Sequence, residues 1–364
     1  MLAFYFINTN KGLQKNMKRI TKLRTPVRFV SYSAVGGNEE SRGALGPMFD
    51  LCDRTDSFGK ESYELAEGEM GRIALNTALS KAHLSHESLD AIIAGDLQNQ
   101  CVASALTLDS FGAPFVGIYG ACSTCTEGLM LGSSLIAAGA CNTVSVVTTS
   151  HNAAAERQFR TPLEYGGQRT PAAQWTSTAS GAFVLSSDEK YSSESNVEIK
   201  EFMIGKIIDG GISDASNMGG AMSFAAADTI LTYFKESEFS PHSFDFIVTG
   251  DLGKVGSNIL SDLLKKELPS AISRHLDCGL LLYDEEKQDM HSGASGCGTS
   301  ASVLSSYFLP MLKRGEIQRI LFLSTGALMS PSSVLQGTTI KGIAPCVVIE
   351  ATGTKNSAKN INTL

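Results

Sequence analysis

Residues 120–125 read Gly-Ala-Cys-Ser-Thr-Cys, between a short apolar stretch, 115–119, and a longer stretch rich in small residues, 127–138. The first stretch has the residue types of a strand and the second those of a buried helix. Cys122 is therefore expected at a helix N-terminus, where unpaired backbone N–H groups and the helix dipole favour a thiolate or a bound anion. The sequence leaves both interpretations open.

The composition sets limits on the class of protein. The chain has 364 residues, of which 43% are hydrophobic and 18% charged, as is ordinary for a globular protein with a large core. The net charge of −7 argues against sequence-independent binding to nucleic acid. No apolar run approaches the eighteen residues of a transmembrane helix. The eight cysteines, several in apolar runs, indicate reduced cytoplasmic thiols rather than a disulfide framework.

Both ends of the chain are expected to lie outside the fold. The first residues are apolar but lack a preceding basic residue, so they make a poor signal peptide. Met17 is an alternative start, and we treat residues 1–19 as an N-terminal extension whose start codon is open. Residues 352–364 are polar and are expected to be frayed.

An internal repeat organises the rest of the chain. Residues 89–97 match 244–252, and each stretch ends in a Gly-Asp-Leu turn. Further along, Gly-Ala-Cys-Ser at 120–123 matches Gly-Ala-Ser-Gly at 293–296, and each leads into a small-residue helix and then a β-branched strand. The period is too long for a solenoid. It predicts an α/β fold of two pseudo-repeated βαβ-type halves, 20–190 and 191–351, stacked as an α-β-α-β-α layered sandwich.

Cys122 is the first candidate for chemistry. As a nucleophile it needs a base within hydrogen-bond reach and an oxyanion hole, which backbone N–H groups at the helix start can supply. With Cys125 it forms a C-x-x-C pattern, which is found in redox pairs and in half of a zinc site, but no second such pair completes a zinc site. The alternative is a small apolar side chain in the core.

Residues 150–160 follow a predicted strand that ends near Thr149. His151 would lie just past a strand end as a base or hydrogen-bond donor, or would simply cap the next helix. Arg157 and Arg160 share a helical face and make a carboxylate-binding fork if they point inward. The competing interpretation is a surface ion pair between Glu156 and Arg160.

Asp96 and Asp251 occupy equivalent Gly-Asp-Leu turns. Two such carboxylates suit acid–base chemistry or cation binding, whereas a single one often accepts backbone N–H bonds within its own turn. Asp251 is the stronger candidate, because Ser295 stands in the second half where the first has Cys122. The glycine-rich loop at 209–222 lacks the phosphate-binding loop pattern.

Together these features resemble the thiolase superfamily. A duplicated α/β half, with a cysteine entering a central helix, is typical of thiolases and ketoacyl synthases. The chain is more closely similar to the stage V sporulation protein AD family of spore-forming bacteria, over about residues 20–350. The matching stretches are 94–97, 115–127, 150–168, 228–230, 248–253, 277–281, 293–297 and 324–331.

The chain departs from thiolases in the groups that move protons. The histidine loop of thiolases corresponds here to residues 291–296, which are one residue shorter and lack the proline. Where thiolases have a second cysteine, this chain has Ser-Thr-Gly-Ala at 324–327. Ketoacyl synthases place two histidines, or a histidine and an asparagine, beside the cysteine, and no such pair is evident here. The resemblance therefore implies a fold that has lost its catalysis.

The family resemblance also implies a ligand. The family is implicated in moving dipicolinic acid (pyridine-2,6-dicarboxylate), with calcium, into the developing spore as a ligand-binding component beside membrane-embedded transport proteins. A thiolate would repel this dianion, so Cys122 is expected to be a neutral thiol. The helix start would hold one carboxylate and Arg157 or Arg160 the other. The expected ligand-binding set is Cys122, Ser123, His151, Arg157, Arg160, Asp251, Ser295 and Thr325.

Further expectations follow from the same resemblance. No cofactor or protein-bound metal is expected, apart from calcium arriving with dipicolinate. A homodimer is expected by analogy with the fold. The protein would lie in the cytoplasm and reach the spore membrane through its partners. The alternatives are an acyltransferase that uses Cys122 on a thioester, and a scaffold with a vestigial pocket.

Overall fold

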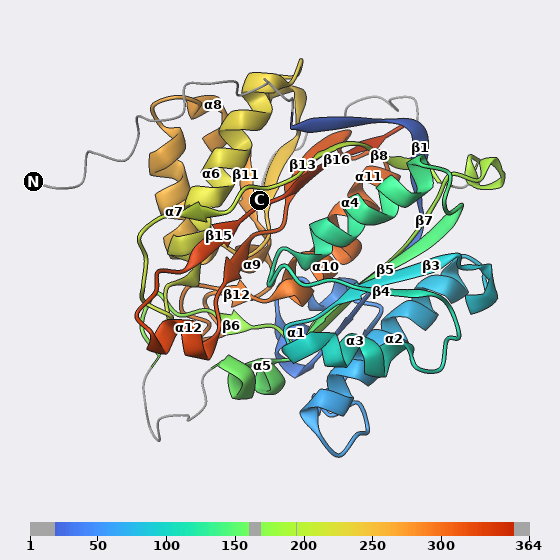
Figure 1. The fold of residues 1–364 in the computed structure, drawn as a ribbon, viewed down its shortest axis with the longest axis horizontal. Coiled ribbons are helices and arrows are strands. Elements are labelled where there is room, and N and C mark those ends of the chain that lie inside the picture. Colours follow the sequence, from blue (N-terminus) through green and yellow to red (C-terminus); the bar gives the residue numbers. More distant parts are fainter. Residues whose placement is uncertain (1–18, 160–168, 194, 353–364) are drawn as a thin grey trace, which may run out of the picture.

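A large, strongly bent sheet runs through the computed structural model, which describes residues 19–159, 169–193 and 195–352 (Figure 1). The sheet has eleven strands in the order β11-β10-β13-β16-β8-β1-β7-β5-β3-β4, and β2 also pairs with β1. Its strands are β1 (Ile20–Gly36), β2 (Leu51–Cys52), β3 (Ala91–Gly95), β4 (Phe115–Gly117), β5 (Thr143–Ser150), β7 (Ala179–Ser186), β8 (Val197–Met203), β10 (Phe246–Thr249), β11 (His275–Asp277), β13 (Arg319–Leu323) and β16 (Cys346–Ala351).

Two small sheets and the helices complete the fold. The small sheets pair β6 (Trp175–Thr176) with β12 (Ala294–Ser295), and β14 (Gly326–Leu328) with β15 (Lys341–Ile343) and β9 (Ile208–Asp209). The helices are α1 (Asn38–Arg42), α2 (Tyr63–Lys81), α3 (Val102–Leu108), α4 (Thr124–Ala137), α5 (Asn152–Phe159), α6 (Met218–Glu236), α7 (Gly253–Leu264), α8 (Pro269–Ile272), α9 (Cys278–Leu281), α10 (Cys297–Val303), α11 (Leu309–Lys313) and α12 (Pro331–Leu335).

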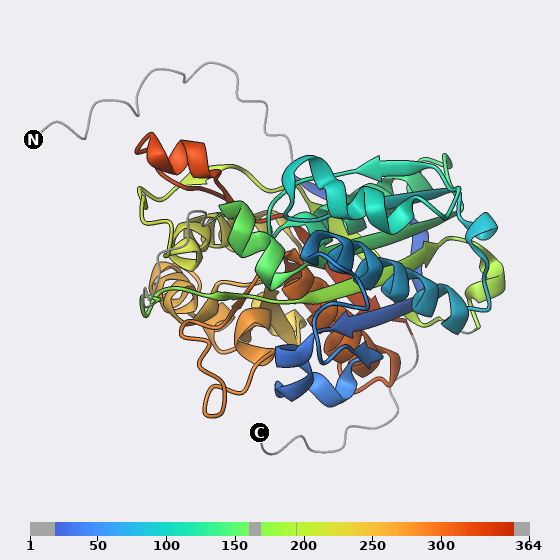
Figure 2. The ribbon, with the colours of Figure 1, turned by 90° about the horizontal axis from the view of Figure 1, so that it is seen from below.

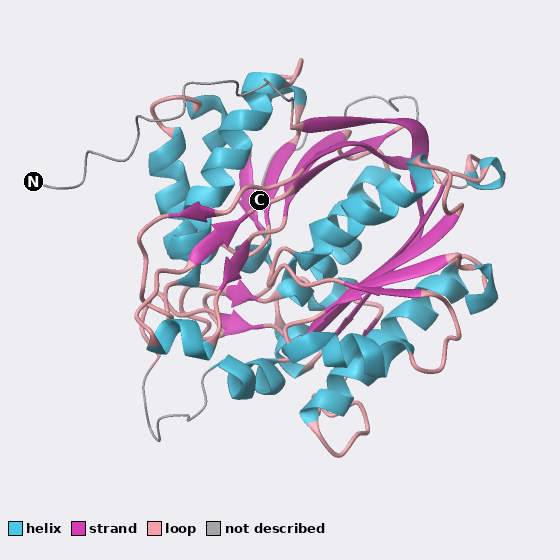
Figure 3. Ribbon diagram, viewed as in Figure 1, coloured by secondary structure: helices cyan, strands magenta, loops and turns pink. Residues whose placement is uncertain are grey.

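The elements form five layers, as the sequence predicts (Figures 1 and 3). Helices α2 and α3 cover the outer face of one half of the sheet, and α6 and α7 cover that of the other half. Helices α4 and α10 lie between the two halves. All eight residues of β5 are buried, because helices cover both faces of the strand. The expected α-β-α-β-α arrangement is confirmed.

Small residues let the central helices approach the strands closely. A Cβ atom added to Gly128 of α4 would lie 2.5 Å from the side chain of Val146 on β5. One added to Gly181 of β7 would lie 2.6 Å from the backbone of Ala301 on α10. These distances are shorter than any real Cβ contact, so the glycines set the spacing of the central layer.

The repeat predicted from the sequence is visible in the topology. Strand β3 pairs in parallel with β4 and β5, and β10 pairs in parallel with β11 and β13. The two halves also share hydrogen bonds, because β1 pairs with β7 through residues 28–36 and with β8 through residues 20–28. The sequence did not indicate this link.

The terminal predictions fall largely outside the described residues. Of the extension at 1–19 only Arg19 is described, and it forms an ion pair with Asp228 on α6, with 2.8 Å between Nη1 and Oδ2. Of the tail at 352–364 only Thr352 is described, and its backbone N–H donates to Asn196 O. In the part of the chain that the structure describes, no helix combines the length and hydropathy needed to cross a membrane.

Candidate functional site

Cys122 lies in a strained turn between β4 and α4. Ala121 before it has a φ of 53°, which is unusual for a residue with a side chain. Ser123 is the N-cap residue of α4, and its Oγ atom lies 2.7 Å from both Gly120 O and Glu127 Oε1. Ser123 therefore fixes the shape of the turn and does not line the cavity beside it.

Asp251 reaches the same place from the second half of the fold, in the turn that follows β10. Its Oδ1 atom accepts a hydrogen bond from Thr325 Oγ1 at 2.8 Å. Its Oδ2 atom accepts from Gly296 N at 3.0 Å and from Ser295 Oγ at 3.2 Å. Complete burial raises the pKa of this carboxyl to about 6, even though these donors and the Cys122 thiol favour its charged form.

The Cys122 thiol faces Asp251 and Ser295. Its Sγ atom lies 3.9 Å from Ser295 Oγ. Burial, and next the negative charge of Asp251, raise the pKa of Cys122 well above that of an ordinary thiol. The thiol is neutral at physiological pH, for a reason found in the protein itself and not in a ligand.

A cavity of about 220 Å³ opens in front of this cluster. Most of its wall is apolar, and hydroxyl groups interrupt it at Thr176, Ser216 and Ser295. Helices α5 and α12 lie near each other in two views (Figures 1 and 2); α5 contributes Ala155, Glu156 and Phe159 to the wall, and Met329 comes from the segment before α12. The lining residues are Leu97, Tyr119, Ala121, Cys122, Ala155, Glu156, Phe159, Thr176, Ala215, Ser216, Met218, Ser295, Ala327 and Met329.

None of the six histidines, all within the described residues, lines the described wall of this cavity. His151 does follow β5, as predicted, but it lines a different cavity, and its Nε2 atom lies 2.8 Å from the backbone oxygen of Asp56. Its predicted role beside Cys122 is therefore not supported by its position.

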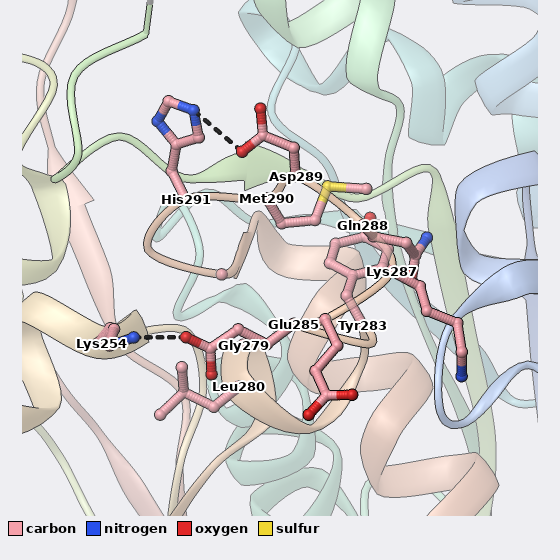
Figure 4. A pocket seen from close by; sticks show the side chains of 12 residues that line it. Lys254, Gly279, Leu280, Tyr283, Glu285, Lys287, Gln288, Asp289, Met290 and His291 are labelled. Atoms are coloured by element: carbon pink, nitrogen blue, oxygen red, sulfur yellow. Dashed lines mark hydrogen bonds and ion pairs between the residues drawn. The ribbon is translucent and has the colours of Figure 1, made fainter.

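His291 lines another cavity, of about 640 Å³, which lies among α7, α9 and the loop 284–293 (Figure 4). Its Nε2 atom lies 3.2 Å from Asp289 Oδ1, and Lys254 forms an ion pair with Glu285 on the same rim. Exposed charged pairs dominate this rim, and His291 is separate from the Cys122 cavity.

The structure places Arg157, the one described arginine of the predicted fork, away from Cys122. Arg157 forms an ion pair with Glu64 of α2, with 2.9 Å between Nη2 and Oε1, and 57% of its side chain is exposed. It does not line the described wall of the Cys122 cavity. Arg160, and with it the predicted pair with Glu156, lies outside the described residues.

Two further sequence patterns are the C-x-x-C of Cys122 and Cys125 and the carboxylates of Asp96 and Asp251. Cys122 and Cys125 are both free thiols, as are the other six cysteines, and Cys125 packs in the core between the sheets. Asp96 does not pair with Asp251; it accepts hydrogen bonds from Gln98 N and Ser104 within its own turn. The C-x-x-C is thus a cavity residue followed by a core residue.

Four of the eight predicted residues therefore come together: Cys122, Asp251, Ser295 and Thr325. Sequence reasoning missed the residues that shape the wall, above all Tyr119, Phe159 and Met329. The glycine-rich stretch 209–222, to which the sequence assigns no role, contributes Ala215, Ser216 and Met218 to the wall.

The fold and this site define a thiolase-like α/β protein. A 3-oxoacyl-[acyl-carrier-protein] synthase III from Aquifex aeolicus is similar in structure with a TM-score of 0.54 and 14% identity, over 88% of this chain and 99% of that one. A variant of OleA from Xanthomonas campestris matches with a TM-score of 0.57 and 13% identity, over 90% and 99% of the two chains. At such identities the likeness shows the fold alone.

The family is shown by sequence. A family model described as stage V sporulation protein AD matches residues 17–350. A stage V sporulation protein AD from Bacillus subtilis (strain 168) is 39% identical over 328 residues, which cover 90% of this chain and 95% of that protein. The chain belongs to the stage V sporulation protein AD family.

Proposed function

We propose that this protein binds dipicolinate without covalent chemistry in the Cys122 cavity and takes part in loading the compound into the developing spore. The observation that carries the proposal is the protonation state of the Cys122 thiol and the side chains around it. Its thiol is neutral, it faces a buried carboxylate, and no histidine lies on the described wall to take its proton. A cysteine in this setting is a weak nucleophile, so the cavity is better suited to binding than to acyl transfer.

The shape of the cavity supports a ligand with one ring. Its volume of about 220 Å³ lies below that of drug-sized sites. Tyr119 and Phe159 offer aromatic surfaces for a planar ring. The Thr176 hydroxyl offers a donor for a carboxylate oxygen, whereas the Ser216 and Ser295 hydroxyls already donate to Asp214 and Asp251 and would have to turn toward the ligand.

Charge supports the arrival of calcium with the ligand. Among the described lining residues none is basic, and the Asp251 carboxylate lies directly behind Ser295. A free dicarboxylate would meet repulsion there. Its calcium chelate carries no net charge, so we propose that the chelate binds more tightly than the dianion. No protein-bound cofactor is part of the proposal.

Calorimetric titration with dipicolinate, with and without calcium, tests the proposal. Isophthalate is the matched control ligand, because it keeps both carboxylates and loses the ring nitrogen that helps to chelate calcium. Ala155→Leu places three extra carbon atoms in the cavity and should abolish binding, whereas Ala138→Leu on the exposed end of α4 should not. Absence of saturable binding with or without calcium would refute the proposal and favour the scaffold.

The acyltransferase alternative makes a different prediction. Incubation with acyl-CoA, followed by intact-protein mass spectrometry, would give an acyl adduct that disappears in Cys122→Ala. Under our proposal no adduct forms. Alkylation of Cys122 by iodoacetamide at pH 7 should be slow, and dipicolinate should slow it further.

We also propose that the protein is a homodimer built on the edge of the large sheet. Among the described strands β4 lies at the end of the sheet, so one side of its backbone has no described strand beside it. Phe115, Val116 and Tyr119 are 42–45% exposed there. An unpaired edge with apolar side chains favours the addition of a second copy. Light scattering should give a dimer mass for the wild type and a monomer mass for Val116→Lys; a monomeric wild type would refute the dimer.

Membrane-embedded transport proteins are the proposed partners. Dipicolinate is charged and must cross a membrane to enter the spore, so a protein that binds it in the cytoplasm has to hand it to a transporter. We propose that the chain reaches the spore membrane through such partners. Recovery of a tagged chain with sporulation membrane proteins, dependent on dipicolinate or on an intact Cys122 cavity, would support this; recovery in the soluble fraction alone would oppose it.

A further inference from the structure

A second cavity, of about 260 Å³, is separate from the Cys122 cavity and lies at the start of α5. Elements far apart in the sequence build it: α1, the loop before α2, the first residue of α2, the β5–α5 junction, and β6. Its lining residues are Glu39, Glu40, Thr55, Asp56, Tyr63, His151, Asn152, Ala153, Trp175 and Thr178.

His151 presents an unused hydrogen-bond acceptor there. The side chain is 1% exposed. Its Nε2 atom lies 2.8 Å from the backbone oxygen of Asp56, and a carbonyl only accepts, so Nε2 carries the proton. Nδ1 is then an acceptor, and it is buried without a partner among the described residues. An unsatisfied buried acceptor is costly, which makes it a marker for a ligand that donates.

The charges around His151 are negative. The Asp56 carboxyl is half-buried, and Oδ1 accepts from Asn38 N at 2.6 Å, but no described basic side chain forms an ion pair with it. Glu40 is buried, and burial raises the pKa of its carboxyl to about 7. Glu39 is the third acidic group, and Arg42 neutralises it. No lysine or arginine is among the described residues that line this cavity.

The aromatic groups also favour a cation. The Tyr63 ring lies against His151, with 5.2 Å between ring centroids, and Tyr63 is partly exposed. Its outer face can therefore take a cation–π contact. Trp175 is less available, because the Arg169 guanidinium already lies 4.9 Å from its ring.

We propose that this second cavity binds a small organic cation with N–H donors, of the alkylammonium class. One N–H group would donate to His151 Nδ1, and the positive charge would lie beside Asp56. The acceptors come from separate walls, which suits a ligand larger than a single ion. The proposal does not depend on dipicolinate binding.

Putrescine is the probe, and 1,4-butanediol is its uncharged control of equal length. We expect saturable binding of putrescine by calorimetry or ligand-observed NMR, and none of the diol. Asp56→Asn is the decisive variant, because asparagine keeps the Oδ1 acceptor for Asn38 N and tolerates the φ of 59° at this position. It should weaken putrescine binding by about tenfold, as expected for the loss of one partly buried charge contact.

His151→Phe removes the acceptor and keeps a ring against Tyr63, so it should also weaken putrescine binding. Glu316→Gln is the matched control, since Glu316 pairs with Arg314 at a site remote in sequence, and it should leave binding unchanged. Equal binding of putrescine and the diol, or an unchanged affinity in Asp56→Asn, would overturn the proposal. Dipicolinate titrations of the same variants should match wild type, which keeps the two sites distinguishable.

Discussion

Replacing Asp251 by asparagine should tighten the binding of calcium-free dipicolinate. The carboxylate lies directly behind Ser295, so a dianion in the Cys122 cavity is repelled by it. Asparagine has the same shape and can keep its Oδ1 atom as the acceptor for Gly296 N and Ser295 Oγ. Its amide then faces Thr325 Oγ1, which can accept. The variant should therefore fold.

The pKa of Asp251 sets the size of the effect. At an effective dielectric constant of 20, two unit charges about 6 Å apart repel each other by about 3 kcal/mol. Protonating a carboxyl whose pKa is about 6 costs only about 1.4 kcal/mol at pH 7. Binding should therefore be accompanied by proton uptake at Asp251. Asp251→Asn, which needs no proton, should lower the Kd about tenfold at pH 7 and hardly at all at pH 5.

Calorimetry at pH 5, 7 and 8, in two buffers with different ionisation enthalpies, measures both the affinity and the protons taken up. The wild type should bind about one proton with each ligand at pH 7, and the variant none. Asp262→Asn, on the exposed face of α7, is the charge-matched control. With calcium present the difference between wild type and variant should largely vanish. An affinity of Asp251→Asn within twofold of wild type at both pH 7 and pH 8 would show that the ligand does not lie beside this carboxylate.

Three further predictions concern the site and the stability of the fold. Cys122→Ser should bind dipicolinate within about threefold of wild type, because a hydroxyl replaces a neutral thiol; complete loss in a folded variant, measured by calorimetry, would point to thiol chemistry. Gly326→Ala would place a Cβ atom 2.3 Å from Gly120 O and should lower the Tm by at least about 3 °C. The control Gly132→Ala, whose added Cβ atom has its nearest contact at 3.3 Å, should not lower the Tm in this way. Equal melting temperatures of the two variants in a thermal scan would contradict this prediction. Burial raises the pKa values of Glu40 and Asp277 to about 7 and that of Asp251 to about 6, so the folded state holds these protons more tightly than the unfolded state above pH 4. The stabilisation of the folded state by these bound protons is lost as pH rises, so Tm should fall between pH 5.5 and 8. Asp277→Asn should flatten this fall in Tm, and an unaltered slope would count against the prediction.

The repeat made much of the fold predictable, and also the meeting of Cys122, Asp251 and Ser295. Ser295 occupies the position of Cys122 in the second half, and Asp251 follows the strand equivalent to β3. Because the two halves pack around α4 and α10, equivalent turns meet at the centre, and that proximity could be inferred from self-similarity alone.

The remaining site predictions depended on long-range packing. His151 and Arg157 do follow β5, but partners distant in sequence hold them elsewhere: the backbone of Asp56 takes the His151 ring, and Glu64 of α2 takes Arg157. The wall residue Met218 comes from a glycine-rich loop without a recognisable pattern. No local periodicity reports such contacts, because they depend on how separate layers are placed.

Strand β1 has a mechanical consequence. It is hydrogen-bonded to β7 in one half and to β8 in the other, so the halves cannot swing apart about a hinge without breaking a continuous ladder. A ligand would then have to enter the Cys122 cavity without separation of the two halves. Ligand binding is therefore expected to leave the relative orientation of the two halves unchanged.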